Sequence, residues 1–428
     1  MTPALETLAP ETGLAKSFGV IPPPADGVPL WRVLVDIGLG GDVREADYPL
    51  AHVGAYDVQR RGALERAAGE AVERYALAQS GSAATRRSLL GMRAESIDFW
   101  WPRWLDQEES EQRTWPWYEG RAGGDGHPVL VPAPAIDYDG GLRHREAAAG
   151  AQAAFDASPS GTAAGLDHES ATRSALLETI ERDAVLCAWA ARAGVWRLGD
   201  ETVSDVATRR LMGDAARLGL RPVFGAIATT VPGIDVVCCV IIDSSGSAPL
   251  TAFGSKASSS RDTARRAALQ EALQIHELLR NLSTQCDRPP AFAEPSPSLV
   301  VDDVARAWWW TTEAGASSME RWIAGWRRDP SPPRTEAAAA EPSYASLVAG
   351  IAQDGGAPII VDLTDRLNLA VRELGWRVVK VVCPGYQQLR MDETVSASLD
   401  PQRILLWARN RGHSVDPFAL CDLPHPLI

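Results

Sequence analysis

Apolar and polar positions alternate with helical spacing in three separate stretches of the chain, at residues 67–76, 175–184 and 268–274. Apolar residues recur there every three or four positions, which is the pattern of a helix with one buried face. The first two stretches share the order Ala-x-x-Glu-x-(Val/Ile)-Glu-Arg-x-Ala, and the third has glutamine in place of the second glutamate. The pattern therefore predicts three helices that carry the same pair of polar side chains, the first of them over about residues 58–79.

Short apolar runs that end at glycine or proline predict strands around these helices. The first strand is expected at residues 30–36, and the run at 129–134 contains prolines, as edge strands often do. Further strands are expected at 221–228, 234–243, 358–362 and 377–383. The strand at 234–243 alternates poorly, which favours burial on both faces. Together these elements predict an α+β protein with helices packed on mixed β-sheets.

The predicted organisation is an N-terminal extension and one long domain. Residues 1–29 are rich in proline, glycine and acidic side chains and are expected to wrap the surface. Residues 30–428 are expected to form the domain, as one large or two interlocked parts, ending in a proline-rich, extended tail from about residue 415. Five tryptophans lie between residues 96 and 117. They are interpreted as a core or interface cluster, with a wall for a bound peptide as the alternative.

Composition excludes several classes of protein. The 428 residues are 45% hydrophobic, enough to bury a large core. The formal net charge of −13, without a basic run, argues against binding to nucleic acid. The longest fully apolar run, residues 184–191, is too short to cross a bilayer, and no basic residue precedes position 16. The six cysteines form no CxxC pair and are expected to be reduced and mostly buried, so a cytoplasmic protein is predicted.

The three helices carry the candidate chemistry. Residues three apart on a helix lie on one face, so each helix projects two oxygen-bearing side chains side by side. Such a set is costly to bury unless something neutralises it, and Mg²⁺ bridged to nucleotide phosphates takes oxygen ligands of this kind. The alternative is that these are solvated helices with surface ion pairs. The presence of three copies in the same register argues against that alternative. The residues are Glu70, Glu73, Arg74, Glu178, Glu181, Arg182, Glu271 and Gln274.

Two loops of small residues precede the second and third helices. The loop at 158–165 contains Ser160 and would allow an anion to approach backbone N–H groups, although a plain turn is the alternative. The segment at 254–260 contains Lys256 but lacks the spacing of a phosphate-binding P-loop. The chain contains neither a nucleophile elbow nor a dinucleotide-binding GxGxxG. A nucleotide would therefore bind through another architecture.

Four motifs, found in order along the chain, carry a resemblance to a known family. They are the helix around Glu70 and Glu73, the loop at 160–165 with the helix at 175–184, the helix at 268–274, and the strand and turn Val-Val-Cys-Pro-Gly-Tyr-Gln at 381–387. Together they resemble the YcaO family, whose members bind Mg–ATP through the paired carboxylates and activate backbone amides of ribosomally made peptides.

The resemblance implies a YcaO-type ATP-binding fold with ATP and Mg²⁺ as cofactors. It places four carboxylates, Glu70, Glu73, Glu178 and Glu181, on the metal and the phosphates. It assigns catalytic roles to Glu178, Glu181, Arg182 and His425, the last within a short form of the family's proline-rich tail. The remaining nucleotide contacts that it implies are Arg74, Ser160, Lys256, Glu271 and Gln274.

The leading hypothesis is a peptide cyclodehydratase that forms azoline rings. A Cys, Ser or Thr side chain of the peptide attacks the preceding carbonyl, and phosphorylation of the oxyanion by ATP allows its elimination. The alternatives are thioamide or amidine formation, and a non-catalytic scaffold, since Arg66, Leu166 and Ser170 depart from residues common in the family. The expected partners are a ribosomal precursor peptide, a separate leader-peptide-binding protein and a second copy of the chain, with no nucleic acid or membrane.

Overall fold

The computed structural model describes residues 3–25, 27–37, 52–79, 85–88, 114–138, 158–287, 292, 296–328, 341–394 and 398–428. The chain divides into two compact units. The first comprises Met1–Pro22, Leu30–Thr179 and Gly355–Tyr386, and the second comprises Pro23–Pro29, Ile180–Asp354 and Gln387–Ile428. The segment at 96–113, with three of the five tryptophans in the predicted aromatic cluster, lies outside the described residues.

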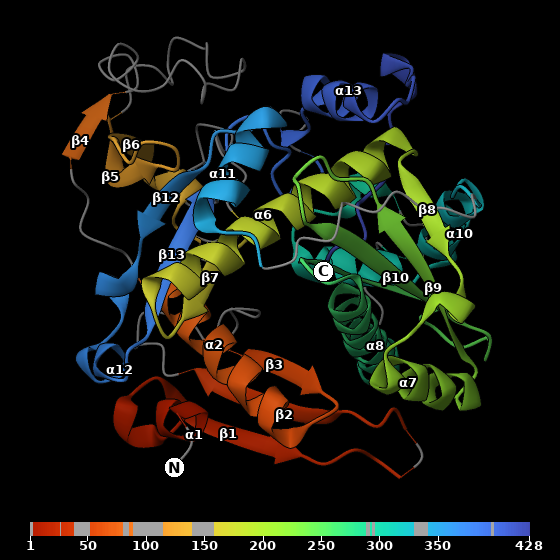
Figure 1. Cartoon of the computed structure of the whole chain (residues 1–428). Coiled ribbons are helices and arrows are strands. Elements are labelled where there is room, and N and C mark those ends of the chain that lie inside the picture. Colours follow the sequence, from red (N-terminus) through yellow and green to blue (C-terminus); the bar gives the residue numbers. More distant parts are fainter. Residues whose placement is uncertain are drawn as a thin grey trace. The chain divides into compact units, whose positions relative to one another are not determined.

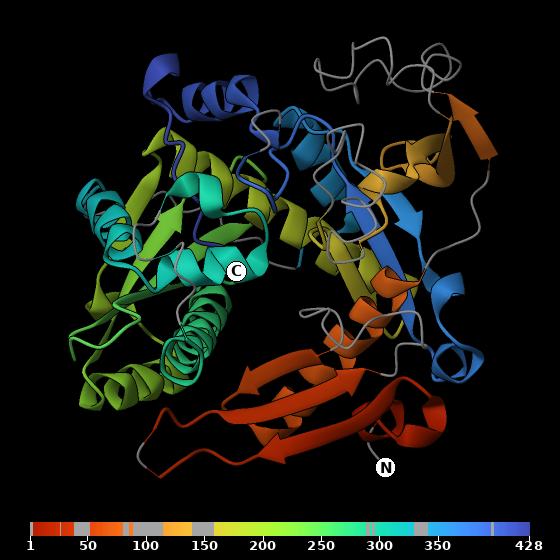
Figure 2. The ribbon, with the colours of Figure 1, turned by 180° about the vertical axis from the view of Figure 1, so that it is seen from behind.

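The first sheet of the first unit consists of β1 (Ala15–Ile21), β2 (Trp31–Ile37) and β3 (His52–Asp57), all antiparallel. Helix α2 (Arg60–Ala78) packs on β2 and β3, and α1 (Pro3–Thr7) packs on α2 (Figures 1 and 2). Nine residues of α2 are buried, most of them alanine, which lets the helix approach the sheet closely. The division into an extension at residues 1–29 and one domain stays a prediction, and within the extension β1 pairs with β2 as an edge strand of this sheet.

The second sheet of the first unit has the strand order β4-β5-β12-β13-β7, and β6 pairs with β5. Its members are β4 (Thr85–Ser88), β5 (Thr114–Ala122), β6 (Pro128–Pro132), β7 (Thr162–Gly165), β12 (Ile359–Asp362) and β13 (Arg377–Val382). Helix α2 also packs on β7 and β13, and α12 (Leu369–Glu373) follows β12 in the chain. Part of the predicted loop at 158–165 is therefore strand β7, paired with β13. The sequence did not predict this strand, because its short side chains lack the pattern of β-branched residues found in the other strands.

Helix α6 (His168–Ala191) begins in the first unit and continues into the second. Asp167 caps it, because its Oδ1 accepts a hydrogen bond of 2.7 Å from the Ser170 backbone N–H. The helix contains the whole second glutamate motif.

The sheet of the second unit has the order β11-β10-β9-β8 and is antiparallel. Its strands are β8 (Val195–Leu198), β9 (Leu220–Ile227), β10 (Asp235–Asp243) and β11 (Thr251–Ser258). Helix α8 (Arg261–Gln285) packs on β10 and β11, and α7 (Val206–Arg217) packs on β9 (Figure 1). Six successive residues of β10 are buried, as the apolar run predicted.

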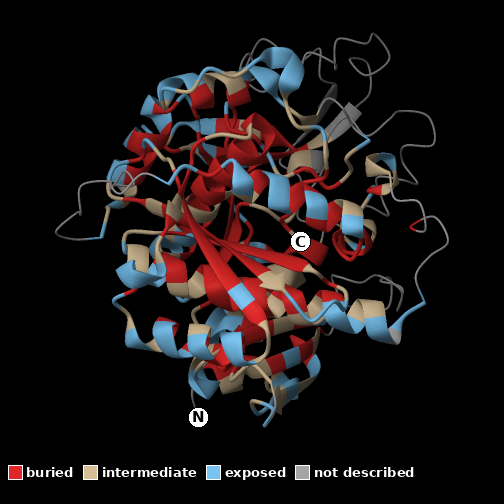
Figure 3. Cartoon of the chain, turned by 90° about the vertical axis from the view of Figure 1, so that its right-hand side faces the viewer, coloured by how far each residue is buried: buried red, intermediate tan, exposed pale blue. Residues whose placement is uncertain are grey.

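The second unit also contains α9 (Asp303–Trp310), α10 (Glu313–Ala324), α11 (Tyr344–Gln353) and α13 (Pro401–Asn410). Its core includes the indoles of Trp189, Trp310 and Trp322, which meet edge to face at centroid distances of 5.1 and 5.8 Å. In Figure 3 buried residues follow the strands, and exposed residues lie on the outer faces of helices. The α+β class is confirmed. Four of the cysteines are buried and free, as expected. No helix in the described part of the chain could cross a membrane.

The last residues of the chain are held in the second unit by burial and by hydrogen bonds. Residues 424–427 are buried in the second unit. The Trp189 indole donates to the Leu423 carbonyl at 3.0 Å, and the Trp310 indole donates to the His425 carbonyl at 3.1 Å. The sequence did not reveal that two indole donors elsewhere in the chain would anchor this segment.

Deletion of residues 424–428 is therefore expected to lower the free energy of unfolding by several kcal/mol. The Trp310 indole would lose its acceptor, at about 1–3 kcal/mol, and the burial of Leu427 would be lost, at about 1.5–3 kcal/mol. Urea unfolding measures the change. Phe418→Ala is the control, since this side chain is 98% exposed and should shift stability by less than about 0.5 kcal/mol. An unchanged midpoint in the deleted protein would show that the segment is only frayed.

Candidate functional site

The first unit brings together three of the predicted carboxylates. Glu70 and Glu73 lie on α2, and Glu178 lies near the point where α6 leaves this unit. The pKa of Glu73 is raised well above its usual value by burial and by the negative charges of Glu70 and Glu178. Burial and the two neighbouring carboxylates thus both disfavour the charged form of Glu73, and a bound cation would oppose that effect.

Two cations lie among these carboxylates. Arg74 donates from Nε to Glu70 at 2.8 Å, one helical turn away, as the motif suggests. Lys380 on β13 is 3% exposed, and its Nζ donates to the Ser158 carbonyl. Burial lowers the pKa of Lys380 to about 8, against the opposing influence of Glu178 and Glu73. Lys380 was not predicted from the sequence. A single lysine inside an apolar strand could have indicated a functional group, because a buried ammonium group needs partners.

In the second unit, Glu181 is bound to strand β11. Its side chain is 2% exposed, and its two oxygens accept hydrogen bonds from the Ser255 hydroxyl at 2.7 Å and the Ala257 backbone N–H at 2.9 Å. The Arg182 guanidinium and the Lys256 ammonium group lie 3.7 and 3.8 Å from the same carboxylate. Glu181 thus has fixed partners on both oxygens, unlike a carboxylate that waits for a metal.

Glu271 on α8 completes the cluster of the second unit. It accepts a hydrogen bond of 2.8 Å from the Ser255 backbone N–H, so Ser255 links Glu181 and Glu271. Burial raises the pKa of Glu271, and so does the charge of Glu181. Ser255 was not among the residues predicted from the sequence, although its neighbour Lys256 was. The close approach of β11 to α8 depends on Gly254, where a Cβ would lie 2.4 Å from the Ala272 nitrogen.

Ser160 and Gln274 lie on the elements that the sequence suggested. Ser160 is half-buried in the turn before β7, and Gly161 beside it has φ of +76°. A Cβ at Gly161 would lie 2.4 Å from the Val381 carbonyl oxygen, so only glycine allows this approach of the turn to β13. Gln274 is half-buried on α8, one turn after Glu271. Their contacts with a nucleotide stay a prediction.

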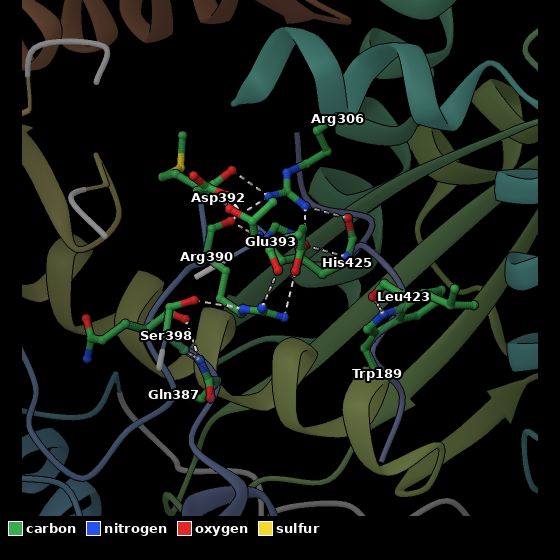
Figure 4. A network of polar contacts seen from close by, with 12 residues as sticks. Trp189, Arg306, Gln387, Arg390, Asp392, Glu393, Ser398, Leu423 and His425 are labelled. Carbon is green, nitrogen blue, oxygen red and sulfur yellow. Dashed lines mark hydrogen bonds and ion pairs between the residues drawn. The ribbon is translucent and has the colours of Figure 1, made fainter. Parts of the chain in front are cut away.

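His425 belongs to the second unit and is 3% exposed (Figure 4). Burial lowers its pKa well below the usual value, and the charges of Arg306, Arg390 and Arg182 lower it further. Its catalytic role stays a prediction. Of these three arginines, Arg182 also lies 3.7 Å from the Glu181 carboxylate.

The residues fit a Mg–nucleotide better than a metal ion held by protein alone. Among the described residues, no three His, Cys, Asp or Glu side chains lie close enough to hold a cation by themselves. Mg²⁺ usually takes one or two carboxylates and completes its shell with phosphate oxygens and waters. In the first unit a bound cation would oppose the burial and the like charges that raise the pKa of Glu73. In the second unit Arg182 and Lys256 carry positive charge of the kind that phosphate oxygens attract.

The family model for YcaO cyclodehydratases, described as ATP- and Mg²⁺-binding, matches residues 56–387. The chain belongs to the YcaO family. The expected family and the expected cofactors, ATP and Mg²⁺, are thereby confirmed. No curated protein sequence matches the chain significantly.

Solved structures confirm the YcaO fold. A heterocyclase in complex with substrate and cofactor is 17% identical with a TM-score of 0.71, over 100% of this chain and 58% of that one. The YcaO protein of Methanopyrus kandleri, bound with AMPPCP and Mg²⁺, is 20% identical with a TM-score of 0.61, over 91% and 90%. The E. coli microcin synthetase McbBCD complex is 12% identical with a TM-score of 0.62, over 86% and 88%. This YcaO chain thus spans little more than half the length of the first of these proteins.

Proposed function

We propose that this YcaO protein is an ATP-dependent cyclodehydratase that forms azoline rings in a ribosomally made peptide. The observation that carries the proposal is the gathering of the family's carboxylates into two clusters that cations accompany. Glu73 with Glu70 and Glu178 forms one cluster, and Glu181 with Glu271 forms the other. Similarity in fold to a heterocyclase solved with substrate and cofactor supports the reaction class.

In this proposal the two clusters have different tasks. Glu70, Glu73 and Glu178 supply carboxylate ligands to a Mg²⁺ ion that phosphate oxygens also bind, since Glu73 lies buried beside the negative charges of the other two. Glu181 orients Arg182 and Lys256 towards phosphate oxygens, since β11 already occupies both of its own oxygens. In this proposal Glu181 is a positioning residue rather than the direct metal ligand that the resemblance implies.

The reaction needs no nucleophile from the protein. A Cys, Ser or Thr side chain of the peptide attacks the carbonyl carbon before it, and negative charge develops on the amide oxygen. ATP, when bound, supplies the phosphoryl group with which that oxygen leaves, so that the peptide loses the elements of one water per ring. The protein holds the reacting groups together, and Arg182 and Lys256 stabilise the charge that develops between them.

The proposed partners are a precursor peptide, a protein that binds its leader segment, and a second copy of the chain. The similar E. coli microcin synthetase was solved as the McbBCD complex, which supports an assembly with other proteins. Light scattering across micromolar concentrations tests the homodimer, and a mass equal to one chain would count against it.

Mass spectrometry of a treated precursor peptide tests the product. We expect the loss of one water per ring, dependent on ATP and on a Cys, Ser or Thr at the modified position. Replacement of that residue by alanine is the control and should leave the peptide unmodified. A sulfur-for-oxygen mass change would assign the protein to thioamide formation. If no peptide is modified in the presence of any candidate partner protein, a scaffold role would be favoured.

A further inference from the structure

A buried group of charged side chains surrounds the last residues of the second unit. We define the C-terminal clamp as Arg306, Arg390 and Glu393 (Figure 4). The Arg306 side chain is fully buried on α9 and donates to Glu393 Oε1 at 2.6 Å. It also donates to the carbonyls of Arg390 and Met391, at 2.6 and 3.0 Å. A planar guanidinium can satisfy several acceptors at once, so Arg306 fixes the loop that carries Glu393.

The clamp holds both backbone polar groups of His425. The His425 N–H donates to Glu393 Oε1 at 3.1 Å, and its carbonyl accepts from Arg306 Nη1 at 3.4 Å. Trp310, also on α9, donates to the same carbonyl. The backbone at His425 is therefore held from two sides, by α9 and by the loop around Glu393.

The same arrangement determines the state of the imidazole ring. His425 Nε2 lies 2.7 Å from the Arg390 carbonyl oxygen, which can only accept, so Nε2 carries the hydrogen. Nδ1 then carries the lone pair, and it has no hydrogen-bond partner among the described residues. The charged groups around the ring are Arg306, Arg390 and Arg182, with Glu393 Oε1 3.8 Å from Nε2. Three cations against one carboxylate favour the neutral ring.

We infer that Arg306 and Glu393 are positioning residues of the proposed reaction, which hold the C-terminal segment in one place and fix the His425 ring with its hydrogen on Nε2. Nδ1 is then the atom through which the ring accepts a proton or a hydrogen bond. The inference rests on the proposed function for its effect on catalysis, whereas the ring state and the attachment of the segment do not depend on it.

Two measurements on the whole protein test the clamp without any activity. Nitrogen-15 NMR of labelled histidine, assigned with His425→Gln, should show a neutral ring with the hydrogen on Nε2. A hydrogen on Nδ1, or a charged ring at neutral pH, would overturn the inference. Hydrogen exchange should show a protected His425 amide that exchanges at least about tenfold faster in Glu393→Gln, which keeps the shape of the side chain but removes its charge. Unchanged exchange would also overturn it.

Steady-state kinetics separate positioning from general stability. Arg306→Met and Glu393→Gln should lower kcat for cyclodehydration about 100-fold, because the ring is displaced, while KM for ATP changes by less than about twofold. Arg409→Met on α13 is the matched control, since this arginine is exposed, and it should behave as the wild type. Arg306→Lys should restore only part of kcat, because an ammonium group lacks the planar fork.

Equal losses in kcat and in nucleotide binding would indicate a structural role alone. If Arg306→Met does not fold, Glu393→Gln and the wild-type spectrum decide the question. If the wild type shows no activity, the proposed function fails while the clamp is still tested by its spectrum and exchange.

Discussion

Glu178→Gln is expected to abolish peptide-dependent ATP consumption while the protein stays folded. The amide has the shape of the carboxylate without its charge. The negative charge of Glu178 raises the pKa of both Glu73 and Lys380. In our proposal this charge holds Mg²⁺ and, through it, the nucleotide. A loss of turnover of at least about 100-fold is expected, because a preorganised charge in a closed site acts far more strongly than one in water. ADP release in the presence of a precursor peptide measures the effect.

Glu169→Gln is the matched control on the same helix. The Glu169 side chain is 72% exposed and pairs with Arg173 at 3.3 Å, which is an ordinary surface ion pair. Its loss should cost at most about 0.5 kcal/mol of stability and no activity. If Glu178→Gln turns over at the wild-type rate, the assignment of this glutamate to the metal is wrong.

Arg403→Met is expected to cause the largest loss of stability, about 3–5 kcal/mol, because it removes the guanidinium that pairs with the buried carboxylate of Asp183 and one of the two that pair with Asp354. Arg403 on α13 donates to both oxygens of Asp183, at 2.9 and 2.6 Å, and to Asp354 Oδ2 at 2.7 Å. Arg411 also pairs with Asp354, at 3.1 Å, but Asp183 would retain only the hydrogen bond from the Gln387 backbone N–H and the weak one from the Cys187 thiol. Urea unfolding measures the change.

The exposed Arg409 on the same helix provides the control, and Arg409→Met should shift stability by less than about 0.5 kcal/mol. Combining Arg403→Met with Asp183→Asn should recover part of the loss, since the unpaired charge of Asp183 disappears. A midpoint for Arg403→Met equal to that of the wild type would contradict a buried ion network at this place.

The helices and their paired polar side chains could be predicted from the sequence, because both depend on the spacing of residues that are close in the chain. The predicted helix at about 58–79 is α2 (Arg60–Ala78), and the paired glutamates lie where the repeated motif placed them. The late strands at 358–362 and 377–383 correspond to β12 and β13 within a residue or two. Each of these predictions used only neighbours on one helix or one strand.

The features that the sequence did not reveal depend on contacts between distant segments. Strand β1 needs β2 as its partner, and Ser255 is informative only when α6 brings Glu181 to its hydroxyl group. The burial of His425 depends on Arg306, which is 119 positions away. No local pattern in the sequence predicts such partners, because side chains of these types are also common on solvated surfaces.

Binding of a non-hydrolysable ATP analogue, measured by calorimetry with and without Mg²⁺, tests the central claim most directly. That claim is that the carboxylates around Glu73 hold the metal through which this YcaO protein binds its nucleotide. The wild type should bind the analogue with Mg²⁺ and at least about tenfold more weakly without it. Glu73→Gln should lose most of that Mg²⁺ dependence, whereas Glu169→Gln should keep it. Equal affinity with and without Mg²⁺ in the wild type, or an unchanged Mg²⁺ dependence in Glu73→Gln, would contradict the account.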